Sequence, residues 1–224
     1  KMFNKVLLSF FDNPESVWYY AYTSALDKYS KYSLLVLLTM GTPALLNDWR
    51  NATIEFFIRT FNESLDSIKF NSVIKELENT FISTKMGSKG VIAVEFQNPS
   101  IFDFLFAFLK SNNEIITQLL KASIFTNQIF KLFSSNKLAN KQSLILLTEK
   151  QIRIVESRII EAYDRLSSSL VAQDTKNEWH RVNNTYYQTI EHFWNFALAS
   201  KSDFLKELAE YEFEEKIYFS KNFN

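Results

Sequence analysis

Few side chains in this chain have the types and spacing that metal chemistry requires. His180 and His192 are the only two histidines, and the pattern around them predicts that both lie on one helix. Twelve residues on a helix span about 18 Å. We therefore expect packed or surface histidines and no metal site. Cysteine is absent, which excludes thiol catalysis and cysteine-based zinc sites and fits a reducing cytoplasm.

Acid–base and nucleophilic catalysis also lack a suitable group of residues. Glu76 with Glu78, and Glu207 with Glu210, could suggest paired carboxylates, but exposed helix faces account for both pairs. Ser100 has neither a histidine nearby nor a nucleophile elbow around it. The phosphate-loop pattern Gly-x-x-x-x-Gly-Lys-Ser/Thr is missing. The sequence thus predicts no catalytic residue and no bound cofactor in this chain.

Composition indicates what kind of fold carries these residues. Of 224 residues, 46% are hydrophobic and 22 are phenylalanines, which suits large aromatic contacts between helices. Lys and Arg total 25 and balance 25 Asp and Glu, so no global field attracts nucleic acid or anionic lipid. No apolar run approaches the roughly 20 residues that a membrane helix needs, and we expect no membrane contact. The chain does not begin with methionine, which suggests a piece of a longer protein.

The first half of the chain shows helix signals followed by one hairpin. We predict an N-terminal helix and linker over residues 1–30, a domain over 31–110 and a helical domain over 111–224. Within the second, the predicted helices are Tyr32 to Met40, Ala44 to Thr60 and Phe70 to Asn79. Predicted strands Thr80 to Met86 and Val91 to Gln97 flank Gly87-Ser88-Lys89-Gly90, and a helix covers Ile101 to Lys110. Three helices and a hairpin are the order of a winged-helix domain.

Strand signals end at Ser111. The predicted helices after it are Ile115 to Phe133, Lys141 to Gln173, Thr175 to Ala199 and Ser202 to Phe219, forming a bundle or a short helical array. The overall prediction is a mainly α fold. An aromatic cluster falls in this part, and we expect it to pack between helices or, where exposed, to bind protein: Trp179, Tyr186, Tyr187, Phe193, Trp194 and Phe196.

The junction between the hairpin and the next helix is the most informative stretch. Pro99 lacks an amide hydrogen and ends the strand ladder. Ser100 is predicted to cap the helix, and Asp103, three residues later, to receive the cap reciprocally. These three residues predict an abrupt strand-to-helix turn.

Two phrases of the chain resemble the C-terminal part of bacterial STAND-class NTPases, which are signal-transduction ATPases related to AAA+ proteins. One is Phe96-Gln97-Asn98-Pro99-Ser100-Ile101-Phe102-Asp103-Phe104, and the other is Asn13-Pro14-Glu15-Ser16-Val17-Trp18, followed by the apolar run after Tyr32. The resemblance covers about residues 12–110.

That resemblance implies a regulatory and protein-interaction region that relays nucleotide state between an upstream ATPase core and a C-terminal helical sensor. It implies ATP and Mg²⁺ in the upstream domain, a protein trigger, homo-oligomerisation and a role in antiviral defence. Related proteins place a histidine against the nucleotide phosphate where this chain has Gln97 or Asn98. Gln97 can donate a hydrogen bond but cannot titrate.

A stand-alone winged-helix regulator that binds DNA and dimerises through its helical tail is the alternative. Lys75 on the third helix, with Lys85 and Lys89 in the hairpin, would contact phosphates. Glu76 and Glu78 on the same helix would repel them.

Overall fold

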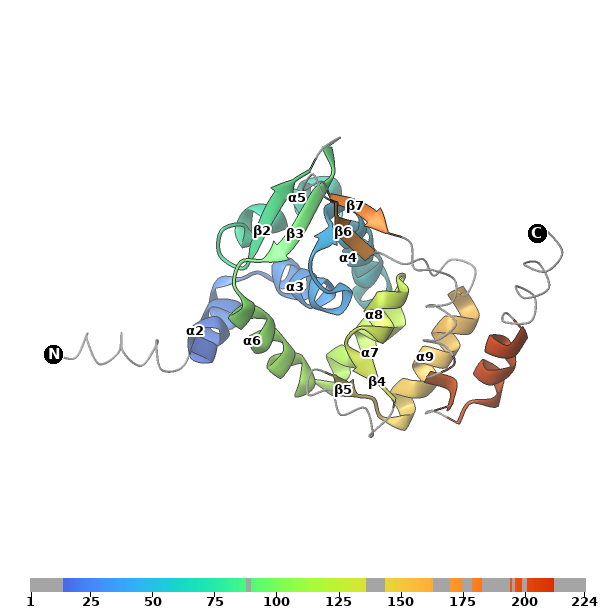
Figure 1. Ribbon diagram of the computed structural model, residues 1–224. Coiled ribbons are helices and arrows are strands. Elements are labelled where there is room, and N and C mark those ends of the chain that lie inside the picture. The colour runs from blue at the N-terminus through green and yellow to red at the C-terminus, as the bar shows by residue number, and fades with distance from the viewer. Residues whose placement is uncertain are drawn as a thin grey trace.

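The computed structural model describes residues 14–87, 90–135, 144–162, 170–174, 179–182, 194, 196–198 and 201–211 (Figure 1). The fold is mainly α, as the sequence predicts, with three small sheets among the described residues. Asn13, Ser88, Lys89, Tyr186, Tyr187, His192 and Phe193 lie outside the described residues.

The N-terminal helix continues into a wider turn before the first core helix. α2 covers Pro14–Tyr20, and the π-helix η1 covers Ala21–Ala25. α3, Lys28–Met40, starts where the Asp27 side chain accepts from the Ser30 amide at 2.7 Å. It ends at Gly41, whose φ of 74° suits glycine. The predicted helix over 32–40 is confirmed, and the Asp27 cap extends it towards the N-terminus.

The next two helices follow a short strand that the sequence did not predict. β1 is Ala44–Leu45, α4 is Leu46–Phe61 and α5 is Ser67–Leu77. Asp66 caps α5 by accepting from the Lys69 amide at 2.8 Å. Two residues are too few to show an alternating pattern, and only pairing with a distant strand makes β1 a strand.

The predicted hairpin is confirmed. β2, Ile82–Met86, pairs antiparallel with β3, Ile92–Phe96, and β1 pairs with the other edge of β3. The strand order is therefore β1-β3-β2. α6, Pro99–Lys110, follows the hairpin. The order of three helices, a hairpin and a helix over residues 28–110 agrees with the prediction.

Several predictions after residue 111 are wrong. The helix expected over 115–133 is two helices, α7 Asn113–Ala122 and α8 Thr126–Phe130. The break occurs because the Gln128 side chain accepts from the Ile124 and Phe125 amides, at 2.9 and 3.1 Å, and so replaces helical hydrogen bonds.

The helices expected over 141–173 and 175–199 are wrong in part, because three short strands fall within these ranges among the described residues. β5, Ile145–Leu146, pairs in parallel with β4, Phe133–Ser134, and α9 covers only Glu149–Ala162. β6, Leu170–Gln173, and β7, Trp179–Val182, form an antiparallel hairpin. Residues 203–211 form a helix, as expected. Strands of two to four residues are too short for the sequence to reveal their period.

One contiguous cluster of buried side chains runs from Tyr22 to Ala209. Its largest fully buried members lie in the first half of the chain: Trp49, Phe56, Phe57, Phe70 and Phe81. The cluster crosses the predicted boundary at 110/111, and the Asn127 amide donates to the Met40 carbonyl at the end of α3, at 2.7 Å. α4 also packs on α7. The division into two domains there stays a prediction.

Candidate functional site

The junction between β3 and α6 is built by Asn98 and Pro99. Asn98 has extended backbone angles, and its Oδ1 accepts from the Ser100 amide at 2.9 Å. Pro99 occupies the first helical position, where no amide hydrogen is needed. The prediction that Ser100 caps α6 is therefore wrong, because Pro99 places the cap one residue before itself. Asp103 is exposed and takes no part in the cap, since the position three residues after Asn98 is Ile101.

Ser100 instead joins the junction to the N-terminal helix. The Trp18 indole Nε1 donates to Ser100 Oγ at 2.9 Å, and the Ser100 hydroxyl lies 3.0 Å from Asn98 Oδ1, to which it donates. The Trp18 ring also packs on Phe81, with centroids 5.4 Å apart. The two sequence phrases that carry the resemblance thus meet in space, 82 residues apart in the chain.

Tyr22 anchors the same N-terminal segment further along α6. It is buried, and its ring centroid lies 5.6 Å from that of Phe104 and 4.9 Å from that of Phe108. Its hydroxyl donates to the Lys31 carbonyl at 3.2 Å. Burial raises the pKa of Tyr22, and nearby Tyr32 adds to this effect, so the phenol stays a neutral donor. α2 and η1 are therefore held to α6 by aromatic packing and the Trp18–Ser100 hydrogen bond, and to α3 by the hydrogen bond of the Tyr22 hydroxyl.

The predicted nucleotide-sensing residues have different surroundings. The Gln97 backbone amide donates to the Phe81 carbonyl at 3.0 Å, and its side chain is exposed. Asn98 is also exposed, but its side-chain oxygen is committed to the α6 cap. Gln97 is therefore the one of the two whose side chain is available to a partner.

Two of the three predicted DNA-contact lysines, Lys75 and Lys85, lie among the described residues. Lys75 is exposed on α5. Lys85 Nζ lies 2.5 Å from Glu95 Oε2 across the β2–β3 pair, which offsets its charge. Lys89 lies outside the described residues.

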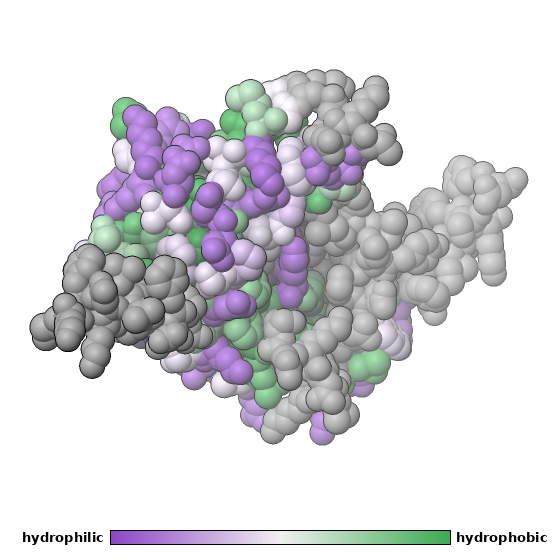
Figure 2. All heavy atoms as spheres, turned by 60° about the vertical axis from the view of Figure 1, so that its left-hand side comes forward, coloured by the Kyte–Doolittle hydropathy of each residue, from purple (hydrophilic) through white to green (hydrophobic). Residues whose placement is uncertain are grey.

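Glu76 on α5 and Glu78 directly after it, both expected to repel phosphate, make hydrogen bonds within the fold. Glu76 accepts from the Ser30 hydroxyl and, at 3.3 Å, from the Asp27 amide. Glu78 accepts from Thr84 Oγ1 at 2.6 Å. Among the described residues on the face shown in Figure 2, hydrophilic side chains gather at the upper left, with hydrophobic ones among them.

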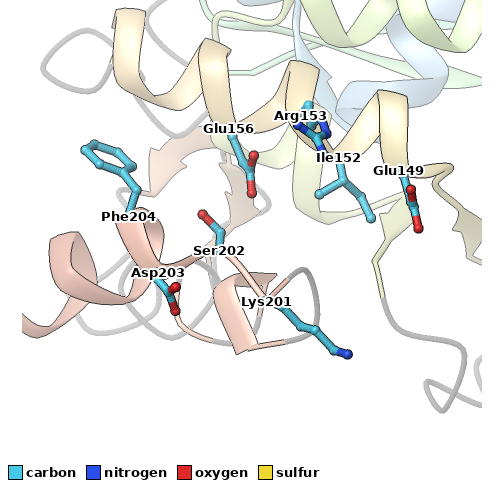
Figure 3. A pocket seen from close by; sticks show the side chains of 8 residues that line it. All are labelled: Glu149, Ile152, Arg153, Glu156, Lys201, Ser202, Asp203 and Phe204. Carbon is cyan, nitrogen blue, oxygen red and sulfur yellow. The ribbon is translucent and has the colours of Figure 1, made fainter.

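A hollow of about 480 Å³ lies between α9 and the start of the helix at 203–211 (Figure 3). Eight residues line it: Glu149, Ile152, Arg153, Glu156, Lys201, Ser202, Asp203 and Phe204. The lining includes three carboxylates, two cations and two apolar side chains, so neither sign of charge is alone there. It contains no histidine or cysteine, and in the described part of the chain no group of three or more His, Cys, Asp or Glu side chains could hold a metal ion.

Sequence reasoning missed an ionic cluster between α4 and α9. Arg59 Nη1 lies 3.1 Å from Glu161 Oε1, and Arg158 Nη1 lies 3.2 Å from the same oxygen. Arg158 is only 5% exposed, and its Nε donates to the Ser123 carbonyl at 2.7 Å. The two guanidinium groups, with the hydrogen bond from Arg59 as the main cause, lower the pKa of Glu161. Burial, followed by repulsion from Arg59, lowers the pKa of Arg158.

The predicted histidine and aromatic residues of the C-terminal part do not share one helix. His180 and Trp179 lie on strand β7, which contradicts the helix expected there. Trp194 is partly buried, and Phe196 is buried against Phe130 with ring centroids 5.9 Å apart. Packing is thus the role of Phe196.

No protein family, curated protein or solved structure matches this chain. Among the described residues, no helix is both long enough and apolar enough to cross a membrane. The arguments about function therefore depend on the residues and contacts themselves.

Proposed function

We propose that this chain is a regulatory and protein-interaction region of a STAND-like ATPase of the cytoplasm, in which residues 31–110 form a winged-helix domain. In this proposal the domain relays the nucleotide state of an upstream ATPase core to the helices after residue 111. ATP and Mg²⁺ belong to the upstream domain of the same protein. A protein trigger, homo-oligomerisation and a role in antiviral defence complete the proposal.

The observation that carries the proposal is the contact between Trp18 and Ser100. The two phrases that resemble the family are far apart in the sequence, and their side chains meet at one hydrogen bond. A segment that enters from the N-terminal side is thereby fixed to the start of α6. A movement of that segment would reach the β3–α6 junction directly, as a relay requires.

The alternative, a DNA-binding regulator, has less support from the contacts. A duplex-binding surface needs several unpaired cations close together. Lys85 pairs with Glu95, and Lys69 Nζ lies 3.5 Å above the Tyr29 ring. Lys75 alone does not make a phosphate-binding surface.

Photolabelling of the natural gene product tests the proposal. An antibody against this chain would be used to recover the polypeptide from its source after irradiation with an azido-ATP analogue and Mg²⁺. We expect a labelled polypeptide well above 26.3 kDa, with the label outside this segment. An unlabelled polypeptide of about this mass, which binds duplex DNA more weakly as salt is raised, would overturn the proposal in favour of the alternative.

A further inference from the structure

The hollow between α9 and the helix at 203–211 has room for a small organic molecule. Its volume of about 480 Å³ lies within the roughly 300–1,000 Å³ that is usual for ligand pockets. In Figure 3, Ile152 comes from α9 and Phe204 from the helix that faces it. The Phe204 side chain is 47% exposed, so its ring is available to pack on a ligand.

Arg153 lies in the middle of the charged side chains that α9 contributes to the hollow. It follows Glu149 by four residues and precedes Glu156 by three, and both spacings place side chains on one helix face. Arg158 and Glu161, at the second spacing on the same helix, pair at 3.2 Å. Among the described residues, however, no ion pair joins Arg153 to Glu149 or Glu156. The guanidinium and both carboxylates are therefore available to a ligand.

The opposite side of the hollow has fewer groups to offer, because two of them are bonded within their own helix. Ser202 Oγ accepts from the Leu205 amide at 3.3 Å and so caps the helix at 203–211. Asp203 Oδ1 lies 3.6 Å from Lys206 Nζ, and the Asp203 side chain is 91% exposed. The charges that could hold a ligand are thus mainly those of α9.

We propose that this hollow binds a free α-amino acid with an apolar or aromatic side chain. Arg153 pairs with the carboxylate of the ligand, and Glu156, the half-buried acid of the lining, accepts from its ammonium group. Ile152 and Phe204 cover its side chain.

A zwitterion fits this lining better than an ion of one sign. A simple anion leaves Glu149 and Glu156 without a partner, and a simple cation is repelled by Arg153. An amino acid supplies one charge of each sign and an apolar group in one small molecule. The inference goes beyond the proposed relay of nucleotide state and does not rest on it.

Three probes that share one ring test whether both charges of the ligand are recognised. L-phenylalanine carries both charges, N-acetyl-L-phenylalanine lacks the ammonium, and L-phenylalanine amide lacks the carboxylate. Titration of the full chain, followed by NMR chemical shifts, measures each dissociation constant. We expect L-phenylalanine to bind about tenfold more tightly than either of the other two. No saturable binding of L-phenylalanine at millimolar concentrations, or binding of the amide as tight as that of L-phenylalanine, would overturn the proposal.

Substitutions on α9 locate the binding site. Arg153→Gln is expected to weaken the binding of L-phenylalanine about tenfold and to remove its advantage over the amide. Glu156→Gln is expected to remove its advantage over the N-acetyl form. Lys150→Gln is the matched control, because Lys150 is an exposed cation of the same helix outside the lining, and all three probes should bind this variant as they bind the wild type. Circular dichroism checks that each variant is folded. If Arg153→Gln alters the binding no more than Lys150→Gln does, the ligand binds elsewhere and the proposal fails.

Discussion

Two helices are fixed to the body of this protein by different physical means. α2 with η1 is attached by rings: Trp18 packs on Phe81, just before β2, and Tyr22 packs on Phe104 and Phe108 of α6. α9 buries Val155 and Ile159 and packs on α7, and charges join it to α4, where Glu161 pairs with Arg59 and Arg158. Aromatic packing depends little on salt or pH, whereas an ionic contact depends on both. The difference indicates that the contact between α4 and α9 can respond to solution conditions, while the ring contacts of α2 and η1 do not.

The side chains buried near the two contacts also differ. Under the N-terminal attachment, α3, α4 and α5 bury several large rings, including Trp49, which is fully buried against Phe70 with centroids 5.1 Å apart. Around α9, buried polar groups take part, among them Gln151, whose Nε2 donates to the Asn113 carbonyl at 3.2 Å. Polar contacts are directional, so a single substitution is expected to loosen α9 without unfolding the first part.

Removal of the central ring should have the largest effect. Trp49→Ala is expected to cost about 3–5 kcal/mol, because it leaves a cavity and removes the hydrogen bond from Trp49 Nε1 to the Ser33 carbonyl. Urea unfolding followed by circular dichroism measures this loss. Ile68→Ala, at a side chain that is 78% exposed, is the control and is expected to change stability by less than about 0.5 kcal/mol. Equal losses for the two variants would contradict the aromatic account of the first part.

Removal of the ionic contact should lower the free energy of unfolding by a smaller amount, and this amount should depend on pH. Glu161→Gln leaves buried Arg158 without its carboxylate and is expected to cost about 1–2 kcal/mol at pH 7. The value is limited because the Glu161 side chain is 52% exposed and solvent screens the pair. Glu207→Gln, at an exposed carboxylate on the helix over 203–211, is the matched control and is expected to be neutral.

The sign of the pH effect follows from the lowered pKa of Glu161. Its stabilising contribution is complete above the unfolded value of about 4.3 and is lost as pH falls through the lower folded pKa. Urea unfolding from pH 7 to pH 3 should therefore show the wild type and Glu161→Gln converging below about pH 4. A difference in the free energy of unfolding that stays constant over this pH range would show that the charge of Glu161 does not stabilise the contact between α4 and α9.

Loss of the α6 cap should lower the stability by less than the two changes above. Asn98→Ala is expected to cost about 1 kcal/mol by leaving the Ser100 amide without its acceptor. Asn98→Asp keeps an acceptor at the helix start and is expected to retain the stability. Thermal unfolding of both variants measures the difference. If Ser100→Ala costs as much as Asn98→Ala while Asn98→Asp also loses stability, the assignment of Asn98 as the cap is wrong.

Long helices and the β2–β3 hairpin were predictable because their patterns are local. The apolar run in α3 and the turn glycines around residues 87–90 each indicate one structure over many residues. A serine hydroxyl commonly caps a helix, and the sequence therefore favours Ser100. The cap is Asn98 because Pro99 occupies the first helical position. The sequence therefore indicates which side chains build the junction, but it does not show that Asn98 is the cap and that Ser100 bonds to Trp18.

The contacts that join the two parts could not be predicted. Arg59 and Glu161 are 102 residues apart, and nothing in either local pattern indicates the other. β6 and β7 have four residues each, which is too short for their period to reveal the strands. Trp18 and Ser100 were both singled out from the sequence, but as parts of separate phrases whose meeting required the fold.

A double-mutant cycle on Trp18 and Ser100 tests the central claim most directly. Trp18→Phe removes the indole donor and keeps a ring against Phe81, and Ser100→Ala removes the acceptor. The free energies of unfolding of the wild type, both single variants and the double variant would be compared. We expect a coupling of about 1 kcal/mol, so that the second substitution costs little once the first is present. Strictly additive losses would mean that the two phrases do not act through this contact, and would contradict a relay from the N-terminal helix to the β3–α6 junction.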